Sequence, residues 1–332
     1  MNSAFATTGT TVTVTAPSRL HLGFLDLNGG VGRRFGSIGL AISGPRTRLS
    51  MAFASQTHIG GLESERVCRY VETMRDVLDV SHAYDVRVDE AIPRHAGLGS
   101  GTRLALAVAA GMRRLHGLPL DLRGDAIRLG RGARSGAGIG LFERGGLVVD
   151  GGRGTTPVPA PVISRLPFPD RWRVLLVLDL HRQGVHGTDE TSAFAHLPPA
   201  SDADASYLCR VLVMKLLPAV AEADLPAFGS AVAGMQERLG DYFASAQGGR
   251  RFVSSHVAAA LDLLQLAGAV GIGQSSWGPT GYAFAPTAEA AGQMLEAARS
   301  RLAGDSVDIL ICKGLNGGAD IIAHAPADAP PS

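Results

Sequence analysis

Hydrophobic and polar residues alternate near the start of the chain, and this pattern predicts a β-strand. Residues 11–15 read Thr-Val-Thr-Val-Thr, so valines face one side and threonines the other. The strand ends at Ala16-Pro17 and leads into a second extended segment at residues 19–26. Further strands are predicted at residues 48–53, 85–88, 146–150, 172–179, 270–276, 281–284, 307–312 and 319–324.

Other stretches carry apolar residues every three or four positions, which predicts amphipathic helices. They lie at residues 65–78, 103–115, 125–134, 206–222, 225–239, 256–266 and 288–302. The mixture of antiparallel-looking strands and helices predicts an α+β protein.

Proline repeatedly interrupts regular structure at residues 155–161 and 167–169, so the boundary between two lobes is expected there. We predict an N-terminal lobe at residues 1–165, a C-terminal lobe at residues 166–325, and a disordered tail at residues 326–332 that is rich in Pro and Ala.

Composition narrows the classes of function. The 332 residues include 31 Lys and Arg against 30 Asp and Glu, and no run of basic residues occurs. Nucleic acid is therefore not expected as a partner. The three cysteines are far apart in sequence, which indicates neither a disulfide framework nor a zinc site. No leader peptide and no membrane-spanning run is recognisable, so we expect a cytoplasmic protein that uses small-molecule substrates.

A glycine-rich stretch precedes the predicted helix at residues 103–115. Residues 93–102 read Pro-Arg-His-Ala-Gly-Leu-Gly-Ser-Gly-Thr. Glycines at alternate positions let backbone N–H groups converge, and the helix behind them adds its positive end. Ser100 and Thr102 could cap the helix or donate to phosphate oxygens. The stretch therefore predicts an anion cradle, with an ordinary strand-to-helix turn as the alternative.

Two common phosphate motifs are excluded. A P-loop requires Gly-Lys followed by Ser or Thr, but the lysines, Lys215 and Lys313, follow Met and Cys. The dinucleotide fingerprint fails because Thr102 stands at the position of its third glycine.

The remaining form, Pro-x-x-x-Gly-Leu-Gly-Ser-Gly-Thr, resembles the phosphate-binding motif of the GHMP kinase superfamily. Other segments resemble one branch of it, the β-ribofuranosylaminobenzene 5′-phosphate synthases of methanopterin biosynthesis, and the likeness runs from about Val12 to His324. The segments that carry it are residues 19–26, 33–42, 134–136, 142–146, 184–190 and 273–280.

The resemblance implies a two-lobed GHMP-kinase-like fold, with an N-terminal lobe like ribosomal protein S5 and a C-terminal ferredoxin-like α/β lobe. It also implies a homodimer and a requirement for Mg²⁺. The implied reaction joins phosphoribosyl pyrophosphate to 4-aminobenzoate or 4-hydroxybenzoate, with release of CO₂ and pyrophosphate.

One departure argues against a kinase. Kinases of this superfamily commonly carry an aspartate base just after the second helix, but residues 135–142 contain no carboxylate and the nearest is Glu143. A hydroxyl nucleophile benefits from a positioned proton acceptor. An ATP-dependent small-molecule kinase remains the first alternative, and a non-catalytic ligand-binding protein the second.

The resemblance suggests residue roles. Gly97, Gly99, Ser100, Gly101 and Thr102 would hold the diphosphate, with Mg²⁺. Asp26 would bind the metal or face the developing ribosyl cation, with a turn residue as the alternative. Arg33 and Arg34 would bind the benzoate carboxylate or the 5-phosphate, with an exposed pair as the alternative.

Further substrate-binding candidates lie in the remaining matched segments. Trp277 would stack on the aromatic acid or fill the lobe interface, and Arg134 belongs to the matched segment or to a solvated stripe with Arg128 and Arg131. His186, with Asp189 and Glu190, resembles a metal-ligand set, although a ligand-free loop is the alternative. The full set is Arg19, His21, Arg134, Ser135, His186, Gln274, Ser275, Ser276, Trp277, Gly278, Thr280 and Asn316.

Overall fold

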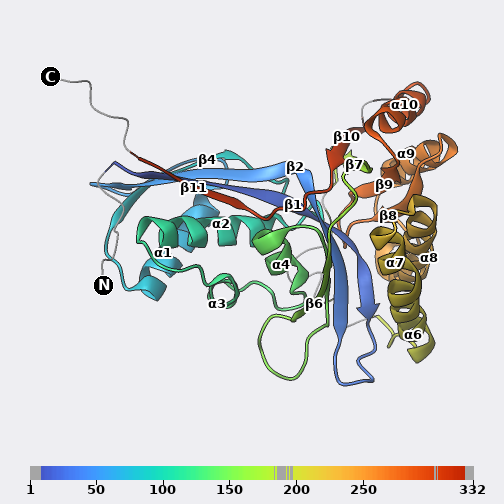
Figure 1. Ribbon diagram of the computed structural model, residues 1–332, viewed down its shortest axis with the longest axis horizontal. Coiled ribbons are helices and arrows are strands. Elements are labelled where there is room, and N and C mark those ends of the chain that lie inside the picture. The colour runs from blue at the N-terminus through green and yellow to red at the C-terminus, as the bar shows by residue number, and fades with distance from the viewer. Residues whose placement is uncertain are drawn as a thin grey trace.

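The computed structural model describes residues 9–182, 184, 192, 194, 197–302, 304 and 306–325, and it contains two β-sheets with helices on their faces (Figure 1). The predicted α+β class is confirmed. The predicted tail at residues 326–332 lies outside the described residues.

The first sheet is built around a long antiparallel hairpin. Its order is β11-β1-β2-β4-β3, and β5 joins β2 to β6. The strands are β1 (Thr11–Asp26), β2 (Phe35–Ala54), β3 (His58–Gly61), β4 (Ala83–Glu90), β5 (Leu147–Asp150), β6 (Val162–Leu166) and β11 (Asp320–His324). One face is covered by α1 (Ser64–Leu78), α2 (Ser100–Leu115), α3 (Leu122–Arg128) and α4 (Ala137–Arg144).

The second sheet is a four-stranded antiparallel layer between two groups of helices. Its order is β10-β7-β9-β8, from β7 (Arg173–Asp179), β8 (Val270–Gln274), β9 (Gly281–Ala285) and β10 (Val307–Lys313). Alternate side chains of β7 enter different cores. Leu175 and Val177 pack with α9 (Ser255–Leu266) and α10 (Ala288–Arg299). Val174 and Leu176 share a core with α6 (Asp202–Val211), the π-helical turn η1 (Leu212–Leu216), α7 (Leu217–Ala221) and α8 (Leu225–Phe243).

The β1–β2 hairpin connects the two lobes. The first half of β1 buries Val12 and Val14 against α2 and its neighbours. The second half buries Leu20, Leu22 and Phe24 in the core that also holds β7, β9 and α8. One continuous strand therefore belongs to both hydrophobic cores, and this fixes its middle residues at the junction of the lobes.

Several features depart from the pattern-based expectation. The predicted helix at residues 125–134 is α3, which ends at Arg128, and residues 206–222 are divided by the π-helical turn. Helix α4 was not expected because two of its eight residues are glycine, and strand β6 because proline-rich stretches flank it on both sides. Strand β11 lies within the predicted C-terminal lobe, yet it pairs with β1 from Thr11↔His324 to Thr15↔Asp320. The end of the chain thus returns to the first sheet.

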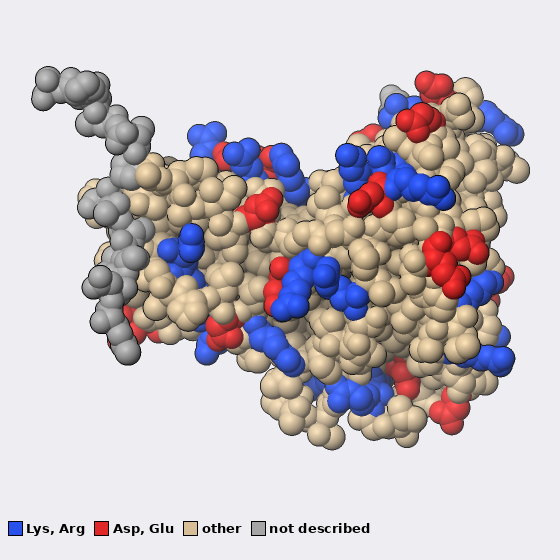
Figure 2. Space-filling model, in the orientation of Figure 1, with Lys and Arg blue, Asp and Glu red and all other residues tan. Residues whose placement is uncertain are grey.

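Charges are mixed over the visible surface. Figure 2 shows basic and acidic side chains interspersed on one face of the molecule. The three cysteines, all within the described residues, are free. No helix in the described part of the chain is both long and apolar enough to cross a membrane.

A buried ion pair fixes α3 against α2. The guanidinium of Arg113 donates from Nε and Nη2 to the two oxygens of Asp125 at 2.5 and 2.7 Å, and Asp125 is fully buried. The hydrogen bond that Arg113 donates to Asp125 raises the pKa of the arginine. Partial burial acts in the opposite direction but has the smaller effect. Because α3 leads directly into residues 130–135, this pair also sets the position of that loop.

We predict that Asp125→Ala lowers the free energy of unfolding by about 3–5 kcal/mol, because it leaves the Arg113 charge without its partner in the interior. Urea denaturation with linear extrapolation measures the change. The matched control is Asp89→Ala, whose ion pair with Arg87 lies on the surface and should change the same free energy by less than about 1 kcal/mol. Equal losses in the two variants would contradict this account.

Candidate functional site

The glycine-rich stretch forms the turn that opens α2. Gly97 and Gly99 have φ angles of 81° and 76°, values that favour glycine because a side chain would be strained there. Gly99 is the N-cap residue of α2, and no side chain caps the helix. The hydroxyls of Ser100 and Thr102 are therefore not used as caps, and both residues line a cleft with the first turn of the helix.

A turn from the second lobe closes against this loop through backbone contacts. The Ser275 hydroxyl donates to the carbonyl of Gly97 at 2.9 Å and accepts from the backbone N–H of His21 at 3.0 Å. A Cβ on Gly278 would lie 2.3 Å from the carbonyl carbon and oxygen of Ala96, and a Cβ on Gly97 would lie 2.1 Å from the carbonyl oxygen of Ser275. Because a Cβ at either position would overlap the opposite backbone, the two turns can approach this closely only with glycine at both positions.

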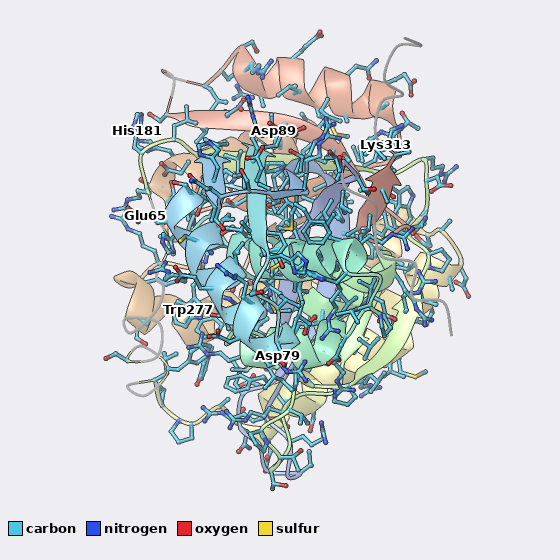
Figure 3. The ribbon with its side chains drawn as sticks, turned by 90° about the vertical axis from the view of Figure 1, so that its left-hand side faces the viewer. Glu65, Asp79, Asp89, His181, Trp277 and Lys313 are labelled. Carbon is cyan, nitrogen blue, oxygen red and sulfur yellow. The ribbon has the colours of Figure 1, made fainter. Side chains whose placement is uncertain are left out.

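The cleft between these turns has a volume of about 750 Å³ and is rich in arginine. Six guanidinium groups contribute to its lining, and none of the described lining residues is acidic. In Figure 3, Trp277 from the second lobe and Glu65 at the start of α1 lie on the same side of the molecule. The lining residues are Arg19, His21, Phe24, Arg66, Arg69, Arg94, His95, Gly97, Gly99, Ser100, Gly101, Thr102, Gly130, Arg131, Gly132, Ala133, Arg134, Ser135, Ser276, Trp277 and Gly278.

Two of the arginines approach the start of α2 closely. A Cβ on Gly101 would lie 3.1 Å from both Arg66 Nη2 and Arg131 Nη1. Arg131 donates to the Tyr70 hydroxyl and lies 5.6 Å from the centre of that ring. Two guanidinium groups beside the positive end of a helix create a strong local preference for an anion.

Glu63 stands just outside the lining and orients two of these arginines. Its carboxylate accepts from Arg66 at 2.9 Å and also from Arg94. Although burial alone would raise the pKa of Glu63, the hydrogen bonds and charges of the two arginines lower it. Glu63 therefore remains ionised and partly offsets the positive charge without entering the cleft.

Asp150 supports the opposite wall, and sequence reasoning missed it. Its buried carboxylate accepts from the hydroxyls of Ser37 and Ser135 at 2.6 and 2.9 Å, from the backbone N–H groups at the start of α4 at 3.1 Å, and from that of Gly152 at 3.0 Å. Five donors occupy this carboxylate, so it caps α4 and orients Ser135. The sequence did contain a signal for this role: an aspartate at the end of a predicted strand, followed by two glycines.

An aromatic wall lines one side of the cleft, with His21 and Phe24 from β1 and Trp277 from the second lobe. The ring centroids of His21 and Phe24 are 4.6 Å apart, and Trp277 lies 4.6 Å from Phe243. Burial, and secondarily the charge of Arg19, hold the pKa of His21 well below its usual value. The imidazole is therefore neutral near pH 7 and adds no charge to the arginine-rich lining.

The structure does not bring three predicted catalytic residues into this cleft. Asp26 Oδ1 accepts from the backbone N–H groups of Asn28 and Gly29 at 2.8 and 2.7 Å, which is the turn role given as its alternative. Arg33 donates to the carbonyls of Gly151 and Gly152, and Arg34 to that of Leu27 at 3.2 Å. The end of the β1–β2 hairpin carries all three away from the phosphate loop.

The other candidates separate into lining and supporting residues. Arg19, His21, Arg134, Ser135, Ser276, Trp277 and Gly278 line the cleft. Ser275 joins the two turns, whereas Gln274 binds Gln247 and Val253 within the second lobe. Asn316, a predicted binding residue, does not line the cleft. Its side-chain oxygen accepts from the backbone N–H of Phe168 at 2.7 Å, and its Nδ2 donates to the carbonyl of Phe168 at 2.9 Å. Thr280 is buried behind the turn, and His186 lies outside the described residues.

Four of the arginines that line the cleft were not among the predicted site residues: Arg66, Arg69, Arg94 and Arg131. The spacing of Arg66 and Arg69 on the predicted helix at residues 65–78 was a usable signal, and Arg94 lies within the glycine-rich segment itself. Arg131 was assigned to a solvated helical stripe. The helix actually ends at Arg128, so Arg131 and Arg134 turn into the cleft from a loop.

The described residues do not fit the expected Mg²⁺ well. Magnesium in proteins is usually held by one or two carboxylates together with substrate phosphates. Asp26 and Asp150 already accept several hydrogen bonds, and no group of three or more potential metal ligands occurs among the residues that the structure describes.

Comparisons with known proteins identify both lobes. The chain matches the GHMP kinase N-terminal domain at residues 65–142 and the GHMP kinase C-terminal domain at residues 216–304. It is 37% identical to the β-ribofuranosylphenol 5′-phosphate synthase of Archaeoglobus fulgidus over 81% of this chain and 86% of that one. It is 31% identical to the protein of the same name from Methanothermobacter thermautotrophicus over 81% and 87%.

Solved structures share the fold. Homoserine kinase from Cytophaga hutchinsonii superimposes with a TM-score of 0.64 at 18% identity, over 94% of this chain and 97% of that one. Mevalonate kinase from L. major superimposes with a TM-score of 0.68 at 14% identity, over 92% and 96%. The expected two-lobed GHMP-kinase-like architecture is confirmed.

We predict that Gly278→Ala separates the two turns, because its Cβ would overlap the backbone at Ala96. The free energy of unfolding should fall by about 1–3 kcal/mol, and affinity for inorganic pyrophosphate should fall with it. Chemical denaturation and calorimetric titration measure the two effects.

Gly292→Ala in α10 is the control, because nothing lies within 4 Å of its Cβ position. It should leave pyrophosphate binding unchanged and raise the free energy of unfolding by up to about 1 kcal/mol. If Gly278→Ala behaved like this control, the close contact would not be a constraint on the site.

Proposed function

Because the chain belongs to the β-ribofuranosylphenol 5′-phosphate synthase family within the GHMP kinase superfamily, we propose that it catalyses decarboxylating phosphoribosyl transfer. The donor is phosphoribosyl pyrophosphate and the acceptor is a benzoate with a hydroxyl or amino group at position 4. The relatives are named for a phenol product, which favours 4-hydroxybenzoate as the acceptor, while 4-aminobenzoate is the second acid to test.

The observation that carries the proposal is the charge of the cleft. Its six arginines and the N-terminal end of α2 face one volume, and the described lining contains no acidic residue. Phosphoribosyl pyrophosphate carries a diphosphate at one end and a phosphate at the other, so its charge complements such a site. The Ser100 and Thr102 hydroxyls and the backbone N–H groups of the loop can donate to the diphosphate.

The chemistry needs charge stabilisation more than a base. The bond from C1 of the ribose to pyrophosphate breaks, and its electron pair leaves with the pyrophosphate. The ring carbon that carries the carboxylate forms the new C–C bond. The bond between this carbon and the carboxylate then breaks and CO₂ departs. The electron pair of the broken bond stays with the ring and restores its aromaticity. No proton is removed from carbon, which agrees with a lining that holds arginines rather than carboxylates.

The aromatic wall supports the position of the acceptor. His21, Phe24 and Trp277 line the same cleft as the phosphate loop, so a benzoate placed against them would face the donor held by the arginines. The neutral His21 can exchange a hydrogen bond with the 4-hydroxyl or 4-amino group. Electron density donated by that group makes the attacking carbon nucleophilic.

A kinase activity is less compatible with this lining. Transfer of a phosphoryl group to an alcohol benefits from a base at the alcohol and a carboxylate for Mg²⁺. In the described part of the chain, the buried Asp150 is hydrogen-bonded to Ser135 of the cleft wall, but five donors already occupy its carboxylate.

The decisive assay uses carboxyl-labelled 4-hydroxybenzoate or 4-aminobenzoate with phosphoribosyl pyrophosphate. We expect labelled CO₂ to form in equal amount with pyrophosphate. Transfer of phosphate from ATP to an alcohol, without CO₂ release from either acid, would replace this proposal with the kinase.

Arg66→Ala tests the cationic wall. It removes one charge-assisted contact, so the KM for phosphoribosyl pyrophosphate should rise about 10- to 100-fold. Arg87→Ala is the matched control, since that side chain is exposed on β4 and pairs with Asp89. Unchanged KM in both variants would remove Arg66 from donor binding.

A further inference from the structure

A smaller pocket of about 180 Å³ lies behind the phosphate loop and shares part of its lining with the large cleft. Two residues belong to the small pocket alone, Arg103 of α2 and Gly138 of α4. Arg103 was not singled out by any sequence pattern, because it falls in an apolar helix. The complete lining is Arg19, Gly99, Gly101, Thr102, Arg103, Arg131 and Gly138.

Arg103 is a buried cation, and none of its hydrogen bonds to the described residues reaches an acidic group. Its side chain is fully buried. Nε donates to the carbonyl of Pro17 at 2.6 Å, and Nη1 donates to the carbonyl of Gly138. Nη2 is buried with no hydrogen-bond partner in the described part of the chain. Two neutral carbonyls therefore orient the guanidinium and leave one donor edge unused.

The surroundings increase the cost of this charge. Burial, with a smaller effect from Arg19, lowers the pKa of Arg103 to about 9, so the group is still charged at pH 7. A second guanidinium, that of Arg131, shares the pocket, and its buried Nε also has no partner among the described atoms. A buried charge normally has a partner of opposite sign. Here the described lining supplies only cations, glycines and a threonine.

We propose that the pocket is a subsite for a phosphoryl dianion, which accepts hydrogen bonds from Arg103 Nη2 and Arg131 Nε. A phosphoryl group offers several acceptor oxygens and two negative charges, so it can neutralise adjacent guanidinium groups at once. The backbone at Gly101 and the hydroxyl-bearing Thr102 lie in the same lining. The site thus extends the anion cradle inward from the mouth of the large cleft.

The carboxylate of a benzoate fits this pocket less well. Loss of CO₂ requires the carboxylate to give up its charge, and two guanidinium groups would stabilise the charged ground state instead. A phosphoryl group keeps its charge throughout the reaction. Its source is either the diphosphate or the 5-phosphate of phosphoribosyl pyrophosphate, and this choice of source rests on the proposed function. The phosphoryl subsite itself can be tested without turnover.

The test is calorimetric titration of the full chain with inorganic pyrophosphate and, separately, with ribose 5-phosphate. Arg103→Met removes the charge and keeps an unbranched side chain, whereas Arg103→Lys keeps the charge without the planar fork. We expect Arg103→Met to weaken binding of one probe about 10- to 100-fold, and Arg103→Lys to weaken it less. The probe that is weakened identifies the source of the phosphoryl group.

Arg87→Ala is the control for a general change in charge, because that arginine is exposed and remote from α2. Thermal melting of each variant without ligand separates binding from folding. If Arg103→Met does not fold, the comparison of Arg103→Lys with the wild-type protein decides, since the same two anions can be titrated into both.

Affinities for both probes that stay within twofold of wild type in the folded Arg103 variants would overturn the subsite. Arg103 would then be a brace between β1 and α4 alone. This result is independent of the proposed reaction, because CO₂ release could persist with an unimportant Arg103, and anion binding could depend on Arg103 in a protein that releases no CO₂.

Discussion

The whole site depends on the contact between two glycine turns, one from each lobe. Gly97 and Gly278 bring backbone atoms so close that a Cβ on either would overlap the opposite turn. The Ser275 hydroxyl adds hydrogen bonds to Gly97 and to the second half of β1. Because that strand is buried in both cores, the cleft is a property of how the lobes meet, and the N-terminal end of α2 has a fixed direction.

Charge is then concentrated in a protein whose overall balance is nearly neutral. The chain has a formal net charge of +1, yet six arginines line one cleft. Two acids that the structure describes beside the cleft are engaged elsewhere: Glu63 orients Arg66 and Arg94, and Asp150 caps α4. This separation produces a local positive field within the cleft, although the chain as a whole is nearly neutral.

The sequence predicted the phosphate loop because its information is local: alternate glycines, hydroxyl residues and a helix start are adjacent in the chain. It also predicted most strands and long helices from their periodicity. It could not predict the arginine wall, since Arg66, Arg94 and Arg131 come from three different segments that meet only in the fold. Asp26, Arg33 and Arg34 failed to reach the cleft for the opposite reason. They are adjacent to matched motifs in sequence, but the hairpin end carries them away, and local backbone groups satisfy their side chains.

The contacts of Asp150 show how an acidic residue can lie beside this cleft while the described lining remains positively charged. The start of α4 carries unpaired N–H groups that require an acceptor, and a carboxylate supplied at that point could face either the helix or the cleft. In this chain it faces the helix and binds five donors, including Ser135. What reaches the ligand is therefore a hydroxyl whose orientation is set by a buried acid. Among the described lining residues, the cleft therefore keeps its electrostatic preference for anions and presents the Ser135 hydroxyl rather than the carboxylate that orients it.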